Sequence, residues 1–273
     1  MSVEDRIKNA FDAARARGRI ALAPYVTIGY PSPSATHQII KSVAAAGADV
    51  IEMGVPFSDP LAEGPTIQRS SFLALEKGVT PQVCLDIVTK LRMDGVTTPF
   101  IWMGYYNSVL ALGQENFCKR AAAAGFDGLI IPDLPPEEAG PLREAATKHG
   151  RVMVPLVALT STDDRLALAC NGAGGFIYCV SVLGVTGARQ TVSGRVRNLV
   201  ERVRRHTSLP VGVGFGISKP EHVAEVARYA DGAAVGSALI EAIGNGPEEG
   251  AASRAGDFIK SLVAGAKLMP PPR

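Results

Sequence analysis

The sequence has little net charge, few cysteines and few aromatic residues, and these shortages exclude several classes of protein. Its 28 Lys and Arg residues stand against 26 Asp and Glu, a formal net charge of +2, so charge gives no reason to expect binding to nucleic acid or membranes. The four cysteines show no CxxC spacing and no cluster with histidine, which is typical of free thiols in a reducing compartment and not of a zinc site. No apolar run is long enough to span a bilayer.

The first residues also lack the pattern of an export signal. Glu4, Asp5 and Asp12 are acidic residues in a region where a signal peptide or a transit peptide would have few or none. Together with the free cysteines, this predicts a cytoplasmic protein.

Short apolar segments alternate with helical patterns along the whole chain. The predicted strands are 19–28, 49–54, 99–105, 126–131, 152–158, 175–180, 210–215 and 232–235. The predicted helices are 2–17, 34–46, 66–77, 81–93, 114–124, 136–148, 163–170, 193–206, 219–229, one from 237, and 251–266. Such alternation predicts parallel β/α units, and eight units in 273 residues fit a closed (β/α)8 TIM barrel better than an open doubly wound sheet. We expect one α/β domain over residues 1–268, with an extra N-terminal helix and a flexible tail over 269–273.

A faint repeat supports this count, because a similar short segment precedes each even-numbered strand. The four segments are Ala46–Asp49, Ala124–Asp127, Asn171–Gly174 and Tyr229–Gly232. In each, a glycine or its neighbour suits the left-handed conformation that ends a helix before the chain enters the sheet. No GxGxxG motif follows the first strand, which weighs against a dinucleotide-binding fold.

The second strand and the loop after it contain the first candidate site. Glu52 is the only charged residue in the apolar run Val50–Gly54, and an ionised group there is costly unless it is paired or used. The following loop contains prolines 56, 60 and 65 and two acids, Asp59 and Glu63. Two interpretations are open: a proton-transfer site, or a glutamate capped by backbone N–H groups beside a solvated loop.

The loops after the seventh and eighth strands have the composition of a phosphate site. Gly214–Ser218 ends one strand and Gly236–Ser237 the other, at the two loops that commonly hold phosphate in such barrels. Glycines let backbone N–H groups approach an anion at the start of a helix. The alternative is that Ser218 only caps its helix, within the capping-box pattern Ser218–Glu221, and that the glycines only form turns.

Other features near the strand ends are less specific. The glycine-rich segment 182–190 is either a lid or an ordinary connection, and Thr186 could hydrogen-bond a carboxylate across the mouth if the segment closes. Tyr25, Trp102, Met103 and Ile130 would form an apolar wall or simply belong to the core. No Ser/His/Asp or Cys/His arrangement is visible, and no metal site is expected.

Several of these segments together resemble the alpha chain of tryptophan synthase, over nearly the whole length from Ala23 to Ser237. The matching motifs are Gly54–Pro60, Gly64–Gln68, Pro132–Pro135, Gly184–Gly187 and Gly214–Ser218. The resemblance implies a (β/α)8 lyase that cleaves indole-3-glycerol phosphate to indole and glyceraldehyde 3-phosphate. It also implies no cofactor in this chain, and a beta chain partner that carries pyridoxal phosphate, in a tetramer of two alpha and two beta chains.

The resemblance assigns roles to individual residues. Glu52 matches the family's catalytic glutamate, and Glu63 stands where the family usually has a catalytic aspartate that accepts the indole N–H. Asp59 and Pro60 match the loop that faces the beta chain. The matches to substrate-binding positions are Tyr25, Met103, Ile130, Tyr178, Thr186, Gly187, Phe215, Gly216, Val235, Gly236 and Ser237. Val182 stands where some members have a basic lid residue.

The extra methylene of Glu63 keeps an alternative open, because a misplacement near 1 Å costs about 100-fold in rate. In that alternative the chain is a catalytically weakened subunit that binds the glycerol phosphate and activates the beta chain. Two further readings are a lyase that acts without a partner and another phosphate-binding barrel enzyme of the same pathway. The latter, the synthase that makes indole-3-glycerol phosphate, is expected to use a lysine acid, and no predicted strand contains a lysine.

Overall fold

The computed structural model describes residues 5–180, 189–214 and 216–267, without the side chains of 189–193. The strands are β1 (Ala21–Thr27), β2 (Ile51–Gly54), β3 (Phe100–Met103), β4 (Gly128–Ile130), β5 (Val152–Met153), β6 (Leu156–Ala158), β7 (Ile177–Val180), β8 (Val211–Gly214) and β9 (Gly232–Val235). The helices are α1 (Arg6–Ala16), α2 (Pro33–Ala45), α3 (Pro65–Glu76), α4 (Pro81–Met93), α5 (Tyr106–Leu112), α6 (Gln114–Ala124), α7 (Gly140–Lys148), α8 (Asp163–Cys170), α9 (Arg189–Val203), α10 (Pro220–Val226), α11 (Ser237–Gly244) and α12 (Ala251–Val263), with the 3-10 turn η1 (Glu248–Gly250). None of the helices in these ranges is long and apolar enough to cross a membrane.

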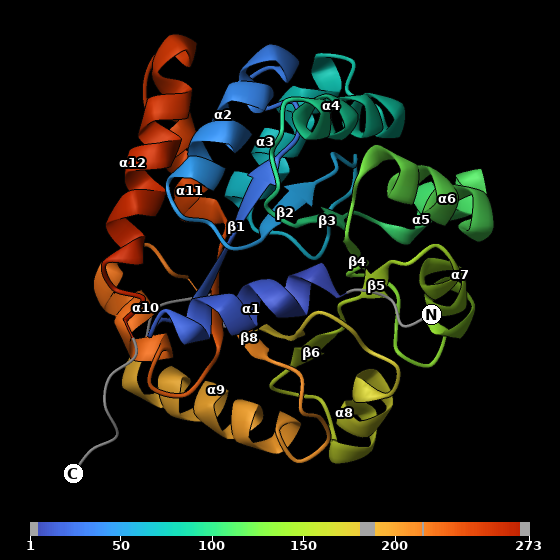
Figure 1. The fold of residues 1–273 in the computed structure, drawn as a ribbon, viewed down its shortest axis with the longest axis vertical. Coiled ribbons are helices and arrows are strands. Elements are labelled where there is room, and N and C mark those ends of the chain that lie inside the picture. Colours follow the sequence, from blue (N-terminus) through green and yellow to red (C-terminus); the bar gives the residue numbers. More distant parts are fainter. Residues whose placement is uncertain (1–4, 181–188, 215, 268–273) are drawn as a thin grey trace.

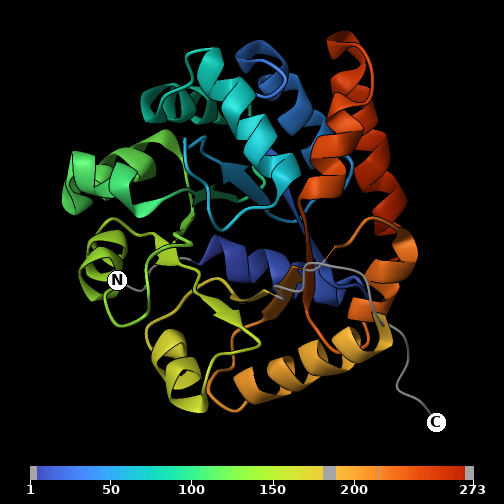
Figure 2. The same ribbon diagram turned by 180° about the vertical axis from the view of Figure 1, so that it is seen from behind.

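The strands form one parallel sheet that curls into a barrel with helices around it (Figures 1 and 2). The strand order is β5-β4-β3-β2-β1-β9-β8-β7-β6, so the two ends of the sheet are consecutive pieces of chain. The segment between them bonds to both sides, because Val154 N–H donates to Leu129 and Tyr178 N–H donates to the carbonyl of Pro155. The predicted (β/α)8 TIM barrel is confirmed.

Side chains alternate between the barrel interior and the layer under the helices. On β3, Ile101 belongs to the interior cluster, which also contains Val50 and Ile130. Trp102, its neighbour in sequence, belongs instead to the cluster between sheet and helices, where its ring packs edge-on against Phe117 at 5.0 Å. Trp102 is therefore a core residue and not part of the mouth.

Helix α1 closes the amino end of the barrel, where the strands begin, and lies across it in Figure 1. Phe11 stacks on Phe176 with ring centroids 4.8 Å apart. A Cβ at Gly232 would lie 2.5 Å from the Phe11 ring, and one at Gly212 would lie 2.8 Å from the Phe176 ring, so these strand glycines leave room for the stacked pair. The open end of the barrel is thus the carboxyl end.

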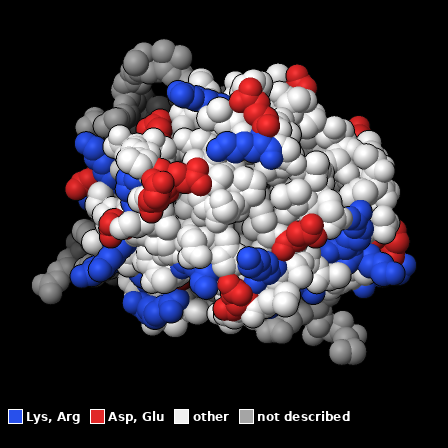
Figure 3. Space-filling view, turned by 90° about the horizontal axis from the view of Figure 1, so that it is seen from above, with Lys and Arg blue, Asp and Glu red and all other residues white. Residues whose placement is uncertain are grey.

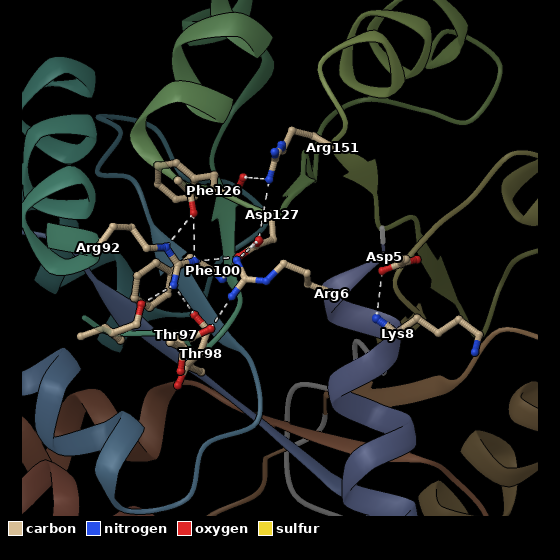
Figure 4. A network of polar contacts seen from close by, with 12 residues as sticks. Asp5, Arg6, Lys8, Arg92, Thr97, Thr98, Phe100, Phe126, Asp127 and Arg151 are labelled. Atoms are coloured by element: carbon tan, nitrogen blue, oxygen red, sulfur yellow. Dashed lines mark hydrogen bonds and ion pairs between the residues drawn. The ribbon is translucent and has the colours of Figure 1, made fainter. Parts of the chain in front are cut away.

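The repeat seen in the sequence has a common role at this amino end. The carboxylates of Asp49, Asp127 and Asp231 each accept the N–H of a residue at or near the start of a neighbouring strand, which is β1, β3 or β8. The residues are Leu22, Phe100 and Val211, at 2.9, 2.8 and 2.9 Å. Each aspartate also pairs with at least one arginine. Figure 4 shows Asp127 surrounded by Arg6, Arg92 and Arg151.

The remaining unit of the repeat, Asn171–Gly174, contains no aspartate. Here the carboxylate comes from the start of the chain: Oδ2 of Asp5 accepts the N–H of Gly175 at 2.6 Å. Asp5 is also the N-cap of α1, since its side chain accepts the N–H of Lys8. Helix α1 therefore completes the ring of carboxylates.

Two predicted elements differ in the structure. The fifth predicted strand is divided into β5 and β6, because Pro155 has no N–H to donate to a ladder. Helix α5 was not predicted; it begins directly after Tyr105 and ends at Gly113, whose φ is 73°. The expected tail 269–273 lies outside the described residues.

The face that is uppermost in Figure 1 has acidic and basic side chains intermixed (Figure 3). No field of one sign covers the visible part of this face, in agreement with the small net charge of the chain.

Candidate active site at the carboxyl end of the barrel

Glu52 is a buried acid without a neutralising partner. It follows Val50 by two residues on the same side of the strand, so it points into the barrel, and it is 1% exposed. No described residue donates a hydrogen bond to its Oε1. Burial, and then the charge of Glu63, raise the pKa of Glu52 well above its ordinary value. A glutamate capped by backbone N–H groups would have its pKa lowered, so the structure does not fit the capped interpretation, and proton transfer at Glu52 stays a prediction.

Glu63 lies in the loop between β2 and α3. Burial raises the pKa of Glu63 to about 7, and the charge of Glu63 raises the pKa of Glu52, so the two carboxyls lie close enough to interact. The backbone around Glu63 is held at both ends: its N–H donates to the carbonyl of Pro60 at 3.0 Å, and its carbonyl accepts from Nε2 of Gln68 at 2.9 Å.

Tyr105, which the sequence did not single out, holds the same loop from the third strand. Its hydroxyl accepts the N–H of Ala62 at 3.0 Å, and its ring stacks on Phe57 at 4.8 Å. Burial raises the pKa of Tyr105 to about 12, so the hydroxyl stays protonated. The clue in the sequence was a polar aromatic residue two positions after the end of a barrel strand.

Tyr25 and Tyr178 flank the two glutamates. Burial is the main cause that raises the pKa of each tyrosine, and the charges of Glu52 and Glu63 add to it. A Cβ at Gly54 would lie 2.1 Å from the Tyr25 hydroxyl, and one at Gly214 would lie 2.5 Å from that of Tyr178. Glycine is thus required at both strand ends for the tyrosines to lie there.

The other predicted wall residues lie in different layers. Ile130 is fully buried in the interior cluster, and Met103 is half-buried against it. Val235 belongs to the cluster on the helix side of the sheet and is 1% exposed, while Ala234 faces the interior. A direct contact between Val235 and a ligand remains a prediction.

The predicted phosphate loops lie beside each other because β8 and β9 are paired strands. Gly216 is exposed and has a φ of 44°, which favours glycine. Gly236 is the N-cap of α11, with no side-chain cap, so the first N–H groups of this helix, beginning with exposed Ser237, are open to an anion. The capping box predicted at Ser218 is wrong: Lys219 is the N-cap of α10, and no side chain caps that helix.

Four predicted features fall outside the described residues. They are Thr186, Gly187, Phe215 and the segment around Val182. Among the described residues, no group of three or more His, Cys, Asp or Glu side chains could hold a metal ion.

The loop before Glu63 has exposed side chains on both sides of a buried proline. Asp59 is exposed and accepts a hydrogen bond from the hydroxyl of Ser58 at 2.5 Å, whereas Pro60 is buried. Leu61 is 90% exposed, an unusual position for a large apolar side chain.

Comparison with known proteins agrees with this geometry. A family profile described as "Tryptophan synthase alpha chain" matches residues 11–263. The chain belongs to the tryptophan synthase alpha chain family. It is therefore a lyase of tryptophan biosynthesis, as the resemblance implied.

Two members of the family match this chain over nearly their whole length, and a third matches it over part of its length. The tryptophan synthase alpha chain of Chloroflexus aurantiacus is 49% identical over 259 residues, which are 95% of this chain and 97% of that one. A solved structure of Mycobacterium tuberculosis tryptophan synthase has a TM-score of 0.88 at 39% identity and covers 97% of this chain and 99% of its own. The tryptophan synthase of Saccharomyces cerevisiae is 42% identical over 266 residues, 97% of this chain but 38% of the yeast protein.

Proposed function

We propose that this member of the family cleaves indole-3-glycerol phosphate to indole and glyceraldehyde 3-phosphate, with Glu52 as general acid and base and Glu63 at the indole N–H. The observation that carries the proposal is the unpaired, buried carboxyl of Glu52 beside a second carboxyl on a braced loop. Perturbed acids that share a concave site are typical of acid–base catalysis.

The raised pKa of Glu52 suits both halves of a retro-aldol cleavage. A protonated Glu52 gives its proton to C3 of the indole, which leaves the ring as an iminium-type cation. The resulting carboxylate then takes the proton of the hydroxyl next to the ring, the carbon–carbon bond breaks toward the ring, and the aldehyde forms. One proton leaves Glu52 and one returns, so the enzyme ends in its starting state.

Glu63 stabilises the cation that forms between these two proton transfers. An ionised carboxylate beside the ring N–H accepts its hydrogen bond and offsets the positive charge on nitrogen. The pKa of about 7 makes a substantial fraction of Glu63 ionised near neutral pH. Its backbone is fixed by Tyr105, acting at Ala62, and by Gln68, so the longer side chain has a defined origin.

Phosphate binding follows from the loops after β8 and β9. The open N–H groups at the start of α11 and the exposed Gly216 would receive the phosphate of the substrate. Ser237 would add its hydroxyl, with Gly187 and Phe215 as further positions of the same site. Tyr25, Met103, Ile130, Tyr178 and Val235 would surround the indole, and Thr186 would meet Glu63 from the lid.

A beta chain is the expected partner, with pyridoxal phosphate in that chain and none in this one. The solved structures of Mycobacterium tuberculosis tryptophan synthase support an assembly, and the loop with exposed Asp59 and Leu61 on either side of the buried Pro60 is the surface we assign to the contact.

An indole-release assay on the isolated chain, repeated with a beta chain added, tests the proposal. We expect slow release alone and faster release in the complex. No release under either condition, with activation of the beta chain by glycerol phosphate, would favour the weakened-subunit alternative, which the extra methylene of Glu63 keeps open.

A further inference from the structure

The amino end of the barrel contains a cavity of about 300 Å³, at the opposite end from Glu52 and Glu63. It lies between the second half of α1, the connection from α9 to β8 and the end of α10. Its lining is Phe11, Asp12, Arg15, Arg19, Ile20, Arg204, Ser208, Leu209, Pro210, Ala227, Arg228, Tyr229, Ala230 and Asp231. Nothing in the reaction described above uses it.

The cavity has more positively than negatively charged side chains in its lining. Four arginines line it against two aspartates, and both aspartates already have partners: Lys8 for Asp12 at 2.5 Å and Arg204 for Asp231 at 2.8 Å. Arg19 is bound to Asp49, outside the cavity.

Arg15 and Arg228 are the two cations that remain. Both side chains are exposed, and neither has a hydrogen-bond or ion-pair partner among the described residues. Neither guanidinium group binds a carbonyl at the end of α1. The carbonyls of residues 13 to 15 accept the backbone N–H groups of residues 17 to 19. Two guanidinium groups are therefore free to bind a doubly charged anion.

The uncharged part of the lining is mainly apolar, with Ser208 and Tyr229 as its polar members, and it offers an organic ligand contacts that a bare ion would not use. Leu209 contributes a half-buried apolar side chain, with Phe11 and Ile20 almost fully buried behind it. The volume is at the lower end of that found for small-molecule sites. Guanidinium groups match the geometry and charge of a phosphate group.

We propose that this cavity binds a small organic phosphate through Arg15 and Arg228, as a second ligand site remote from the reaction. The phosphate lies between the two guanidinium groups and the organic part contacts the apolar wall.

Calorimetric titration of the full chain with phenyl phosphate tests the site. In the double variant R15Q/R228Q, the affinity of one binding component should fall roughly tenfold or more, since a hydrogen bond to a charged group contributes about 1.5–3 kcal/mol. The matched control K90Q/K119Q removes the same charge from exposed positions on α4 and α6 and should titrate like the wild type. Any binding at the carboxyl end is common to all three proteins and cancels in the comparison.

Two results would overturn the proposal. One is an identical titration of both double variants and the wild type. The other is a crystal soaked in phenyl phosphate with density at the start of α11 and none between Arg15 and Arg228. Inorganic phosphate should bind the cavity more weakly than phenyl phosphate, and equal affinity would contradict the role of the apolar wall.

Discussion

The two ends of the barrel differ in the partners that they give to a buried carboxylate. At the amino end, Asp127 accepts the N–H of Phe100 and pairs with Arg6 and Arg92 at 2.6 and 2.7 Å. At the carboxyl end, Glu52 is just as buried, but its Oε1 has no donor among the described residues.

The paired carboxylate contributes to stability, and the unpaired one suits a chemical reaction. A buried charge that is fully paired fixes its neighbours in place and has no free lone pair for a reaction. A buried acid without a partner lowers stability when ionised, and this is the state in which it accepts a proton readily. Sequence alone shows one acid within a strand and one just before a strand; their partners decide which role each has.

The largest effect is expected for the unpaired acid. Glu52→Gln should lower the rate of indole release by about 10²–10⁴-fold, because it removes the general acid and base. The fold should be kept, since the variant removes no hydrogen bond donated to Oε1. Indole release at saturating substrate and thermal unfolding measure the two parts. More than a tenth of the wild-type rate would sink the assignment.

The paired acid should give the opposite result. Asp127→Asn should lower the free energy of unfolding by about 3 kcal/mol, because Arg6 and Arg92 lose their buried partner. Indole release per folded molecule should stay at the wild-type level. Denaturant unfolding followed by an activity assay checks both, and an unchanged unfolding midpoint would contradict the comparison.

Glu63 should rank next. Glu63→Gln should lower the rate of release by about 10–100-fold, the effect of losing a hydrogen bond to a charged group. Glu63→Asp keeps the charge but reaches less far from the braced backbone, so its rate should lie between those of Gln and wild type. If Glu63→Gln leaves the saturated rate unchanged, the role at the indole N–H is wrong.

A smaller effect is expected for the residue that braces the loop. Tyr105→Phe removes the acceptor of the Ala62 N–H and should reduce kcat/KM by about threefold to tenfold. Tyr106→Phe is the matched control, because its hydroxyl accepts a hydrogen bond from Nε2 of Gln114 at the start of α6. Equal effects of the two variants would show that Tyr105 does not position Glu63.

The smallest effect is the change of stability with pH. Burial raises the pKa of Glu63 to about 7 in the folded state, above the ordinary value of 4.5. The folded chain therefore holds a proton that the unfolded chain releases, so this stabilisation is complete below pH 4.5 and is lost as the pH rises through about 7. The melting temperature of Glu63→Gln minus that of wild type should increase over this range. A difference that stays constant from pH 4.5 to 8 would show that the pKa is not raised.

The sequence was sufficient to predict the barrel, because the two patterns that indicate it are local. Each strand is a short apolar run, and the glycines before the even-numbered strands suit the helix ends. The count of eight units then leaves few architectures. Glu52 also stood out, since a charge within an apolar strand must be paired or used.

The sequence could not show which contacts are made across the barrel. Tyr105 and the backbone of Glu63 are more than 40 residues apart, and neither suggests the other. Pro155 divides a strand that hydropathy shows as continuous, and Lys219 begins a helix where Ser218 has the better capping side chain. The contact of Tyr105 and the start of the helix after Lys219 depend on tertiary geometry, whereas the break at Pro155 has a local cause, its missing N–H.

The carboxylate that Asp5 supplies to Gly175 spans 170 positions of the chain. During synthesis the carboxylate of Asp5 therefore has this partner only after residue 175 has been made. The ring of Phe11 has its stacking partner Phe176 only one residue later. Helix α1 can thus complete its contacts only when well over half of the barrel has left the ribosome.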